Sequence, residues 1–429
     1  VLTGAAITVR EAIASYGLGG GRFGNSRLDR LVEATGRKLL SGPYAMTLGN
    51  MFRRKGRLIL TQLVLIMAGT MFLLVTSLSA SIDLTLDNEF NRRNFDLFFV
   101  FDDRYRIDRT TELAHTVAGV EAAEMWFSQS ASILKEDQRM TEAGLGAELN
   151  GVPLDSDFYR PLMVAGRWLQ PGDDRVIVMN QETAVENNIT LGDTVTLDLG
   201  ELGDDEWQVV GFYRVIFGGG FSTDALYAPA PAVFEATKKH NQAGVLRVRT
   251  NRHDAEYTEA VRMQLANIYT GRGMDVLFSL TANEDRVNAE NQFSITTSML
   301  LALAVIVAFV GGIGLMGSLS ISVVERTREI GVMRAIGARS PTILGMFVME
   351  GILQGVFSWA ISVPISLVTG GWLANLLGQA MFDANLDYQY NLAAVGIWLV
   401  VIIIISTIAS ILPARSATTV SVRDSLAYA

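Results

Sequence analysis

Six charged side chains lie close together between two long uncharged stretches: Glu325, Arg326, Arg328, Glu329, Arg334 and Arg339. Glu325 and Arg328 are three residues apart, as are Arg326 and Glu329, and opposite charges at this spacing meet on one side of a helix and stabilise it. The chemistry open to these side chains is ion pairing, within the segment or with the surface of another protein. The pattern favours a short charged helix over 325–339.

Signals for a helix end and a new helix start follow this segment. Gly337 suits the position just past a helix C-terminus, and Ser340 followed by Pro341 suits an N-cap and a first turn. Val332 and Ile336 share their face of the charged helix with acidic side chains, whereas a helix lying on lipid has a cleaner apolar face. Two interpretations stay open: a helix held in contact with protein rather than lipid, and an ordinary charged connecting loop.

Other residues that could do chemistry give weaker signals. The chain has no cysteine, which excludes disulfides and cysteine-based metal sites or nucleophiles, and its three histidines are scattered. The glycine run at 217–221 lacks the following lysine of a phosphate loop. Three acidic pairs are interpreted as solvated loop residues, with carboxylate catalysis or calcium binding as the less favoured alternative: Asp102/Asp103, Asp173/Asp174 and Asp204/Asp205.

Four stretches without Asp, Glu, Lys or Arg surround the charged segment and must position it: 58–82, 291–324, 351–382 and 388–414. A bilayer core of roughly 30 Å needs about 20 apolar helical residues. Each stretch is long enough, and buried helices of soluble proteins rarely run so far without a charge. We therefore predict a membrane α-helical fold with four transmembrane helices.

The distribution of charge predicts the orientation of these helices. Residues 83–290 hold 35 acidic and 19 basic side chains, a net charge of −16, whereas the rest of the chain is net basic. Lysine and arginine in short loops mark the cytoplasmic side of a membrane. The predicted order of segments is a cytoplasmic linker with an amphipathic helix (18–57), a first span (58–82), an extracytoplasmic domain (83–290), a second span (291–324), a cytoplasmic coupling helix (325–339), a third span (340–375), an outer loop (376–390), a fourth span (391–414) and a cytoplasmic tail (415–429).

The large outer segment is predicted to be an α/β domain. Strand, helix and strand patterns follow one another at 95–134 and again at 244–280, which indicates two βαβ units. The helix of the first unit is expected over 109–120. The helix of the second, 254–269, places Tyr257, Val261, Leu265 and Ile268 on one face. The strand-rich middle is read as a β-rich insertion near 155–240.

Small and polar residues mark two further features of the membrane helices. Four small residues recur every third position of the second span and are expected to permit close helix packing: Gly311, Gly314, Gly317 and Ser320. Glu350 lies about ten residues into the third span, where an ionisable residue is a functional candidate. The alternative is that Glu350 caps a helix or pairs with an arginine such as Arg334 at the inner interface.

Residues 311–353, GGIGLMGSLSISVVERTREIGVMRAIGARSPTILGMFVMEGIL, resemble the signature of the FtsX/MacB-like permeases of ABC transporters, the type VII or mechanotransmission group. Residues 44–66 also resemble the approach of that family to its first membrane helix. The resemblance implies a coupling helix that docks on a cytoplasmic ATPase, with these matching residues: Glu325, Arg326, Thr327, Arg328, Glu329, Ile330, Gly331, Arg334, Ala335, Ile336, Gly337, Ala338 and Glu350. It implies an extracytoplasmic MacB-like domain for 83–290.

The same resemblance implies a function and a location. The chain would be a non-catalytic permease subunit of the bacterial cytoplasmic membrane, with both termini cytoplasmic, in which ATP hydrolysis moves the outer domain to export or extract a hydrophobic or amphipathic cargo. ATP and Mg would be bound by a partner ATPase dimer, since the chain has no phosphate-loop motif. Further partners would be a second permease half or protomer and an extracytoplasmic adaptor or cargo protein. One alternative is a signalling device that controls a cell-wall hydrolase or senses a peptide. Another is a receptor or enzyme with its site in the outer domain.

An internal similarity bears on the organisation of the chain. ITVREAIASYG at 7–17 resembles VSVRDSLAYA at 420–429, which follows the last span. Residues 1–17 are therefore expected to be the cytoplasmic tail of a preceding permease half, and the chain is expected to be the C-terminal half of a two-half permease.

Overall fold

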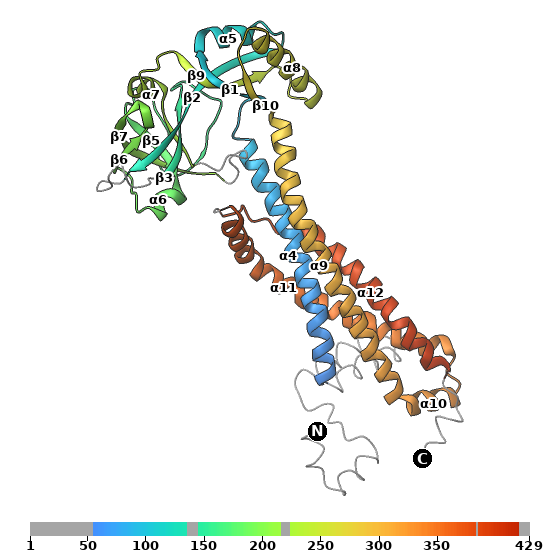
Figure 1. Ribbon diagram of the computed structural model, residues 1–429. Helices are drawn as coiled ribbons and strands as arrows, with labels where there is room; N and C mark the ends of the chain where they lie inside the picture. The colour runs from blue at the N-terminus through green and yellow to red at the C-terminus, as the bar shows by residue number, and fades with distance from the viewer. Residues whose placement is uncertain (1–54, 135–144, 216–223, 383–384, 420–429) are drawn as a thin grey trace. The chain divides into compact units, whose positions relative to one another are not determined.

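The computed structural model describes residues 55–134, 145–215, 224–382 and 385–419 (Figure 1). The chain divides into two compact units. The bundle unit comprises Ser298–Gly370 with the described parts of Val1–Ser77 and Tyr390–Ala429, and the outer unit comprises the described parts of Leu78–Thr297 and Gly371–Gln389. The predicted tail at 1–17, most of the predicted linker and the glycine run at 217–221 lie outside the described residues.

Four long helices account for the apolar stretches: α4 (Lys55–Phe90), α9 (Ala282–Glu325), α11 (Ser340–Phe382) and α12 (Leu392–Thr419). Each is long and apolar enough to cross a membrane by length and composition, which confirms the predicted number of spans. The helices run well past the uncharged stretches. α9 has 44 residues, about 66 Å of helix at 1.5 Å per residue, because its first turns are amphipathic and continue the same helix beyond the apolar part.

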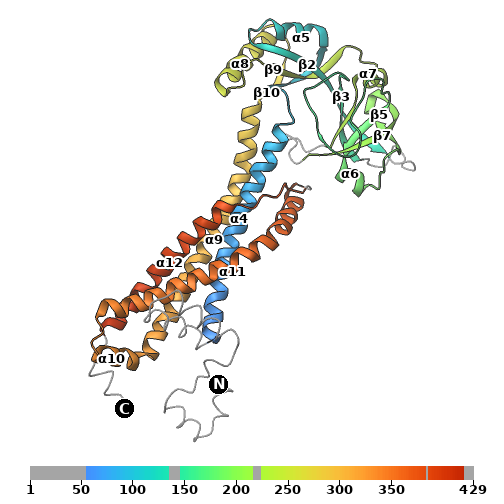
Figure 2. The ribbon, with the colours of Figure 1, turned by 180° about the vertical axis from the view of Figure 1, so that it is seen from behind.

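Small side chains let the helices of the bundle unit approach one another closely. Figures 1 and 2 both show α4 and α9 side by side. A methyl group on Gly311 of α9 would lie 3.0 Å from Leu65 of α4. A methyl group on Gly351 of α11 would lie 1.8 Å from the Ser410 hydroxyl of α12. Larger residues at these glycines would push the helices apart.

The first part of the outer unit consists of two interlocked βαβ units. One is β1 (Leu97–Arg106), α5 (Ile107–His115) and β2 (Val120–Leu134). The other is β9 (Gln242–Thr250), α8 (Ala255–Gly271) and β10 (Val276–Thr281). The strand order β10-β1-β9-β2 with antiparallel neighbours places a strand of the other unit between the two strands of each. The predicted elements are therefore present as split βαβ units.

The helices of these units lie close to their predicted positions. α8 buries Val261 and Leu265 completely and packs Tyr257 and Ile268 against the same core, which confirms the predicted face. α5 ends at His115, earlier than the predicted 120, because the chain turns there toward Gly119, whose φ of +100° cannot continue a helix.

The β-rich insertion begins earlier than predicted. Its elements are β3 (Leu145–Val152), β4 (Leu162–Gly166), β5 (Val176–Asn180), α6 (Gln181–Glu186), β6 (Thr194–Asp198), the 3-10 helix η1 (Gly200–Leu202), β7 (Asp204–Arg214), β8 (Asp224–Pro229) and α7 (Ala230–Thr237). The 15-residue strand β2 pairs with β9 through its first half and with β3 through its second half. The insertion therefore starts within a strand, where no turn residue marks the boundary.

Candidate coupling site

The short helix predicted between the second and third spans is present as α10, Thr327–Ala335. α9 ends at Glu325, and Arg326 breaks the helix with φ −102° and ψ 17°. After α10, Gly337 takes a φ of +101°, its N–H donates to the carbonyl of Arg334, and the N–H of Ala338 donates to that of Met333. This left-handed stop is the one that the position of the glycine predicted, and α11 restarts at Ser340.

One side of α10 is packed into protein. Ile330 is fully buried, and Gly331 beside it is also buried. Ile330 packs in one apolar cluster with Val323 of α9, Phe347 of α11 and Ala414 of α12. Contacts with three long helices distinguish α10 from an ordinary connecting loop, and they fix its position at this end of the bundle unit.

Ion pairs fasten both ends of the break between α9 and α10. The Arg326 guanidinium lies 3.1 Å from the Glu350 carboxylate of α11, whose side chain is only 5% exposed. Arg57 of α4 donates to Glu325 at 3.2 Å. Glu350 thus pairs with Arg326 and not with Arg334, whose guanidinium instead contacts the carbonyl of Thr418 on α12 and lies 3.4 Å from the Ser340 hydroxyl.

The other side of the α9–α10 segment is exposed and follows a helical spacing of three and four residues. Its members are Glu325, Arg328, Glu329, Val332, Ala335, Ile336 and Arg339. Ile336 is 83% exposed, and in the sequence it lies between the charged residues Arg334 and Arg339. We call these seven residues the α10 outer face. An exposed apolar centre with charged neighbours is the composition of a protein-docking surface.

The predicted coupling residues divide between these two sides. Ile330 and Gly331 are buried, and Arg326, Thr327 and Arg334 are half-buried. The exposed members of the predicted set are Glu325, Arg328, Glu329, Ala335, Ile336 and Gly337. The signature therefore combines residues that hold α10 in place with residues that face outward.

The small residues of α9 divide in a similar way. Gly311 packs against Leu65, whereas a methyl group on Gly314 or Gly317 would meet no atom within 4 Å. Ser320 is exposed and donates to the carbonyl of Met316 in its own helix. The stripe beyond Gly311 thus faces away from the rest of the described chain, and its close packing stays a prediction.

A row of buried polar residues on α11 was not predicted from the sequence. Five buried polar residues recur every fourth position along this apolar helix: Glu350, Gln354, Ser358, Ser362 and Ser366. Gln62 of α4 donates to the backbone carbonyl of Gln354 at 3.1 Å, and Ser366 lies 2.9 Å from the Tyr390 hydroxyl. The four-residue spacing in the sequence was the available signal, because it places each of the five next to the following one, about one helical turn along.

A second missed residue lies in the outer unit, on the loop between α11 and α12. Asp387 accepts hydrogen bonds from Arg214 at the end of β7 at 3.0 Å and from Asn88 of α4 at 2.8 Å. Its backbone N–H donates to the Thr85 hydroxyl at 2.9 Å. This one aspartate ties the loop to a membrane helix and to the β-rich insertion, and nothing in its local sequence indicates that role.

Comparisons with known proteins agree with this architecture. The family described as FtsX-like permease C-terminal matches residues 301–422, and the MacB-like periplasmic core domain matches residues 58–268. The two segments together span most of the chain. They assign the α9–α12 region and the outer domain to separate parts of one known type of permease.

Two curated relatives are permeases of ABC transporters, and one solved structure aligns with part of the chain. The macrolide export ATP-binding/permease protein MacB of Acinetobacter baylyi is 27% identical over 70% of this chain and 44% of its own length. An uncharacterised ABC transporter permease of Methanocaldococcus jannaschii is 24% identical over 58% of this chain and 62% of its own length. The periplasmic region of MacB from Actinobacillus actinomycetemcomitans aligns with a TM-score of 0.34 and 14% identity, over 48% of this chain and 98% of that structure.

The chain spans less than half the length of the MacB relatives that it matches. The MacB-like match covers nearly all of α4 and most of the outer α/β domain, and the FtsX-like match covers most of α9 together with α10, α11 and α12. The chain is a multi-pass membrane protein that belongs to the FtsX/MacB-like permeases of ABC transporters and carries a MacB-like periplasmic core domain.

Proposed function

We propose that this chain couples ATP hydrolysis in a separate cytoplasmic ATPase to movement of its outer domain, in order to export or extract a hydrophobic or amphipathic cargo. The α10 outer face would be the docking surface for an ATPase dimer that binds the ATP and Mg. The N- and C-termini would lie on the same, cytoplasmic, side as α10. A second permease half or protomer would complete the transporter, and an extracytoplasmic adaptor or cargo protein would meet the outer domain.

The observation that carries the proposal is the attachment of α10. A force applied to the α10 outer face is passed on only if the helix cannot swing independently, and Ile330 together with the Arg326–Glu350 pair anchors it to three long helices. α4, α9 and α11 each contribute residues to both compact units. Continuous helices of this length are suited to carry a displacement across a membrane.

The test is a charge exchange on the α10 outer face. Arg328→Glu combined with Glu329→Arg keeps the net charge and leaves the buried side of α10 unchanged. We expect the tagged double variant to lose about tenfold or more of its binding to a phosphate-loop ATPase identified by mass spectrometry, because like charges brought together at an interface cost several kcal/mol. Stimulation of ATPase activity by the permease should fall in parallel.

A matched control uses the same exchange on another exposed helix. Glu235→Lys combined with Lys238→Glu, at α7 of the outer unit, also conserves net charge. This control should co-purify with the ATPase as the wild type does. Equal ATPase binding and stimulation by the wild type and the α10 variant would refute the docking assignment.

A further inference from the structure

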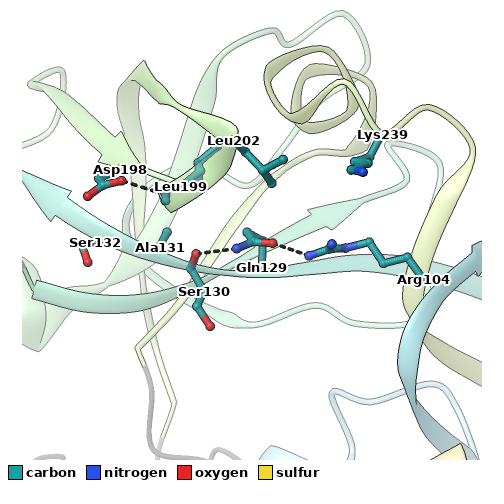
Figure 3. Close-up of a pocket in the computed structure, with 10 residues that line it drawn as sticks. Arg104, Gln129, Ser130, Ala131, Ser132, Asp198, Leu199, Leu202 and Lys239 are labelled. Atoms are coloured by element: carbon teal, nitrogen blue, oxygen red, sulfur yellow. Dashed lines mark hydrogen bonds between the residues drawn. The ribbon is translucent and has the colours of Figure 1, made fainter.

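An open pocket of about 520 Å³ lies in the outer unit (Figure 3). Arg104 of β1 and Lys239, just after α7, line it together with Gln129 and Ser132 of β2, Asp198 and Leu202. Its wall therefore comes from both the split βαβ part and the β-rich insertion. A cavity of this size holds a small ligand.

A bulge in β1 aims Arg104 into this pocket. Val100 pairs with Val245 of β9, but the next pair is Tyr105 with Ala243, so four residues of β1 stand opposite the single residue Gly244. Bulges of this kind redirect side chains, and they are typical of places where a strand serves more than packing.

The Arg104 guanidinium is held in place within the pocket. It stacks 4.8 Å above the ring of Phe127, donates to the carbonyl of Ser128 at 3.4 Å, and contacts the side-chain oxygen of Gln129. The Gln129 amide is fixed in turn by a 3.1 Å hydrogen bond to the carbonyl of Ser130. A guanidinium fixed in advance loses little side-chain entropy when it binds a ligand.

Neither cation of the pocket is held in an ion pair by a carboxylate of the described residues. Arg104 and Lys239 form no ion pair within the described parts of the chain, and the buried Nε of Arg104 lacks a hydrogen-bond partner there. Burial lowers the pKa of Arg104, against the opposing field of Asp103, yet an arginine remains charged at neutral pH. Two unpaired cations in one cavity are notable in a segment with a net charge of −16.

The pocket is also asymmetric. Figure 3 shows Arg104 and Lys239 toward one end and Asp198 toward the other. Asp198 accepts a hydrogen bond from the backbone N–H of Gly200 at 2.8 Å, which holds its carboxylate at that end, and Leu202 supplies an apolar wall. A ligand that fits has an oxyanion at one end and a neutral or cationic group at the other.

We propose that this pocket binds a phosphate-bearing amphiphile or its soluble head group, with the phosphate between Arg104 and Lys239 and a cationic group toward Asp198. The planar fork of arginine suits the oxygens of a phosphate, and lysine adds a second charge-assisted hydrogen bond. The proposal needs no ATPase and stands independently of the coupling function.

The experiment titrates the full-length chain in a non-ionic detergent with O-phosphoethanolamine at constant ionic strength, and detects binding by microscale thermophoresis. Arg104→Gln and Lys239→Gln should each weaken binding about tenfold, because each removes one charge-assisted hydrogen bond. Lys238→Gln is the matched control, since Lys238 is adjacent and exposed but does not line the pocket. It should bind within about twofold of the wild type. Unchanged thermal midpoints of the variants show that the domain is still folded.

Two further arms identify the source of the phosphate and the role of Asp198. A lysophosphatidylethanolamine that binds far more tightly than O-phosphoethanolamine identifies the lipid as ligand, and equal affinities identify the soluble head group. Asp198→Asn should abolish any preference for O-phosphoethanolamine over glycerol 3-phosphate. The proposal is overturned if neither phosphoethanolamine probe binds saturably, or if Lys238→Gln weakens binding as much as Lys239→Gln, which would indicate general surface charge.

Discussion

The ion pair that anchors α10 and the Arg286–Asp87 pair of the outer unit differ in their access to water. In the Arg326–Glu350 pair of the bundle unit, the side chains are 18% and 5% exposed. In the outer unit, Arg286 of α9 contacts Asp87 of α4 with side chains 42% and 46% exposed. The Arg214–Asp387 pair is intermediate, with 23% and 25%.

The difference in exposure implies a difference in how much each ion pair contributes to stability. A buried pair is costly to break, because removing one partner strands a charge away from water. An exposed pair contributes little, since water and salt replace the lost partner. The Arg326–Glu350 attachment is therefore costly to break, while the Arg286–Asp87 tie can open and re-form at low cost. A second tie near the same helix ends, between Arg93 and Asp285, is less accessible, with side chains 13% and 19% exposed.

Removal of the Glu350 carboxylate should have the largest effect. Glu350→Ala leaves Arg326 half-buried and without this partner, and we expect a loss of about 3–5 kcal/mol in the free energy of unfolding. Titration with sodium dodecyl sulfate in mixed micelles, followed by tryptophan fluorescence, measures that free energy.

A double variant separates the ion pair from packing at the same place. Arg326→Met combined with Glu350→Leu removes both charges and keeps most of the volume, so its stability should return to within about 1–2 kcal/mol of the wild type. ATPase stimulation by this double variant shows whether coupling through α10 requires the two charges or only packing at this position. If Glu350→Ala is as stable as the wild type, the Arg326–Glu350 pair contributes no more to stability than the exposed Arg286–Asp87 pair, and the proposed contrast between them is wrong.

Features that are local in the sequence could be predicted. The four spans follow from stretches without charge, the stop at Gly337 follows from a single residue that tolerates a positive φ, and the apolar face of α8 follows from helical spacing. In each case the residues that decide the structure lie within a few turns of one another. The charged segment was likewise recognised as a helix with signals for its own end.

Features that depend on residues far apart in the chain could not be predicted. Pairing with an arginine such as Arg334 was one of the alternatives for Glu350, but no local pattern identified Arg326 of the preceding segment as the partner. Asp387 meets Arg214 across 173 positions, and β1 and β9 interleave across a similar distance. Strand order and long-range ion pairs depend on how elements pack, which no local pattern specifies.

The Arg214–Asp387 tie should give an intermediate effect. Asp387→Asn removes the charge but keeps the shape, and we expect a loss of about 1 kcal/mol. Hydrogen exchange should become faster at the end of β7 and in the loop before α12, because the loop loses its attachment to the insertion. Asp174→Asn, at an exposed turn of the same unit, is the control and should leave exchange in both segments unchanged.

The Arg286–Asp87 pair should give the smallest effect. We expect Arg286→Ala to cost about 0.2–1 kcal/mol at low salt, because both side chains are more than a third exposed. At 1 M salt the screening length falls to about 3 Å, and the difference from the wild type should disappear. The Glu350→Ala loss should persist at the same salt concentration, because ions do not reach a pair whose carboxylate is 5% exposed. The contrary result is that Arg286→Ala lowers the free energy of unfolding as much as Glu350→Ala does, at low and at high salt. That result would mean that the Arg286–Asp87 pair is as costly to break as the Arg326–Glu350 pair. The outer part of α9 would then have to move together with α4 as one piece.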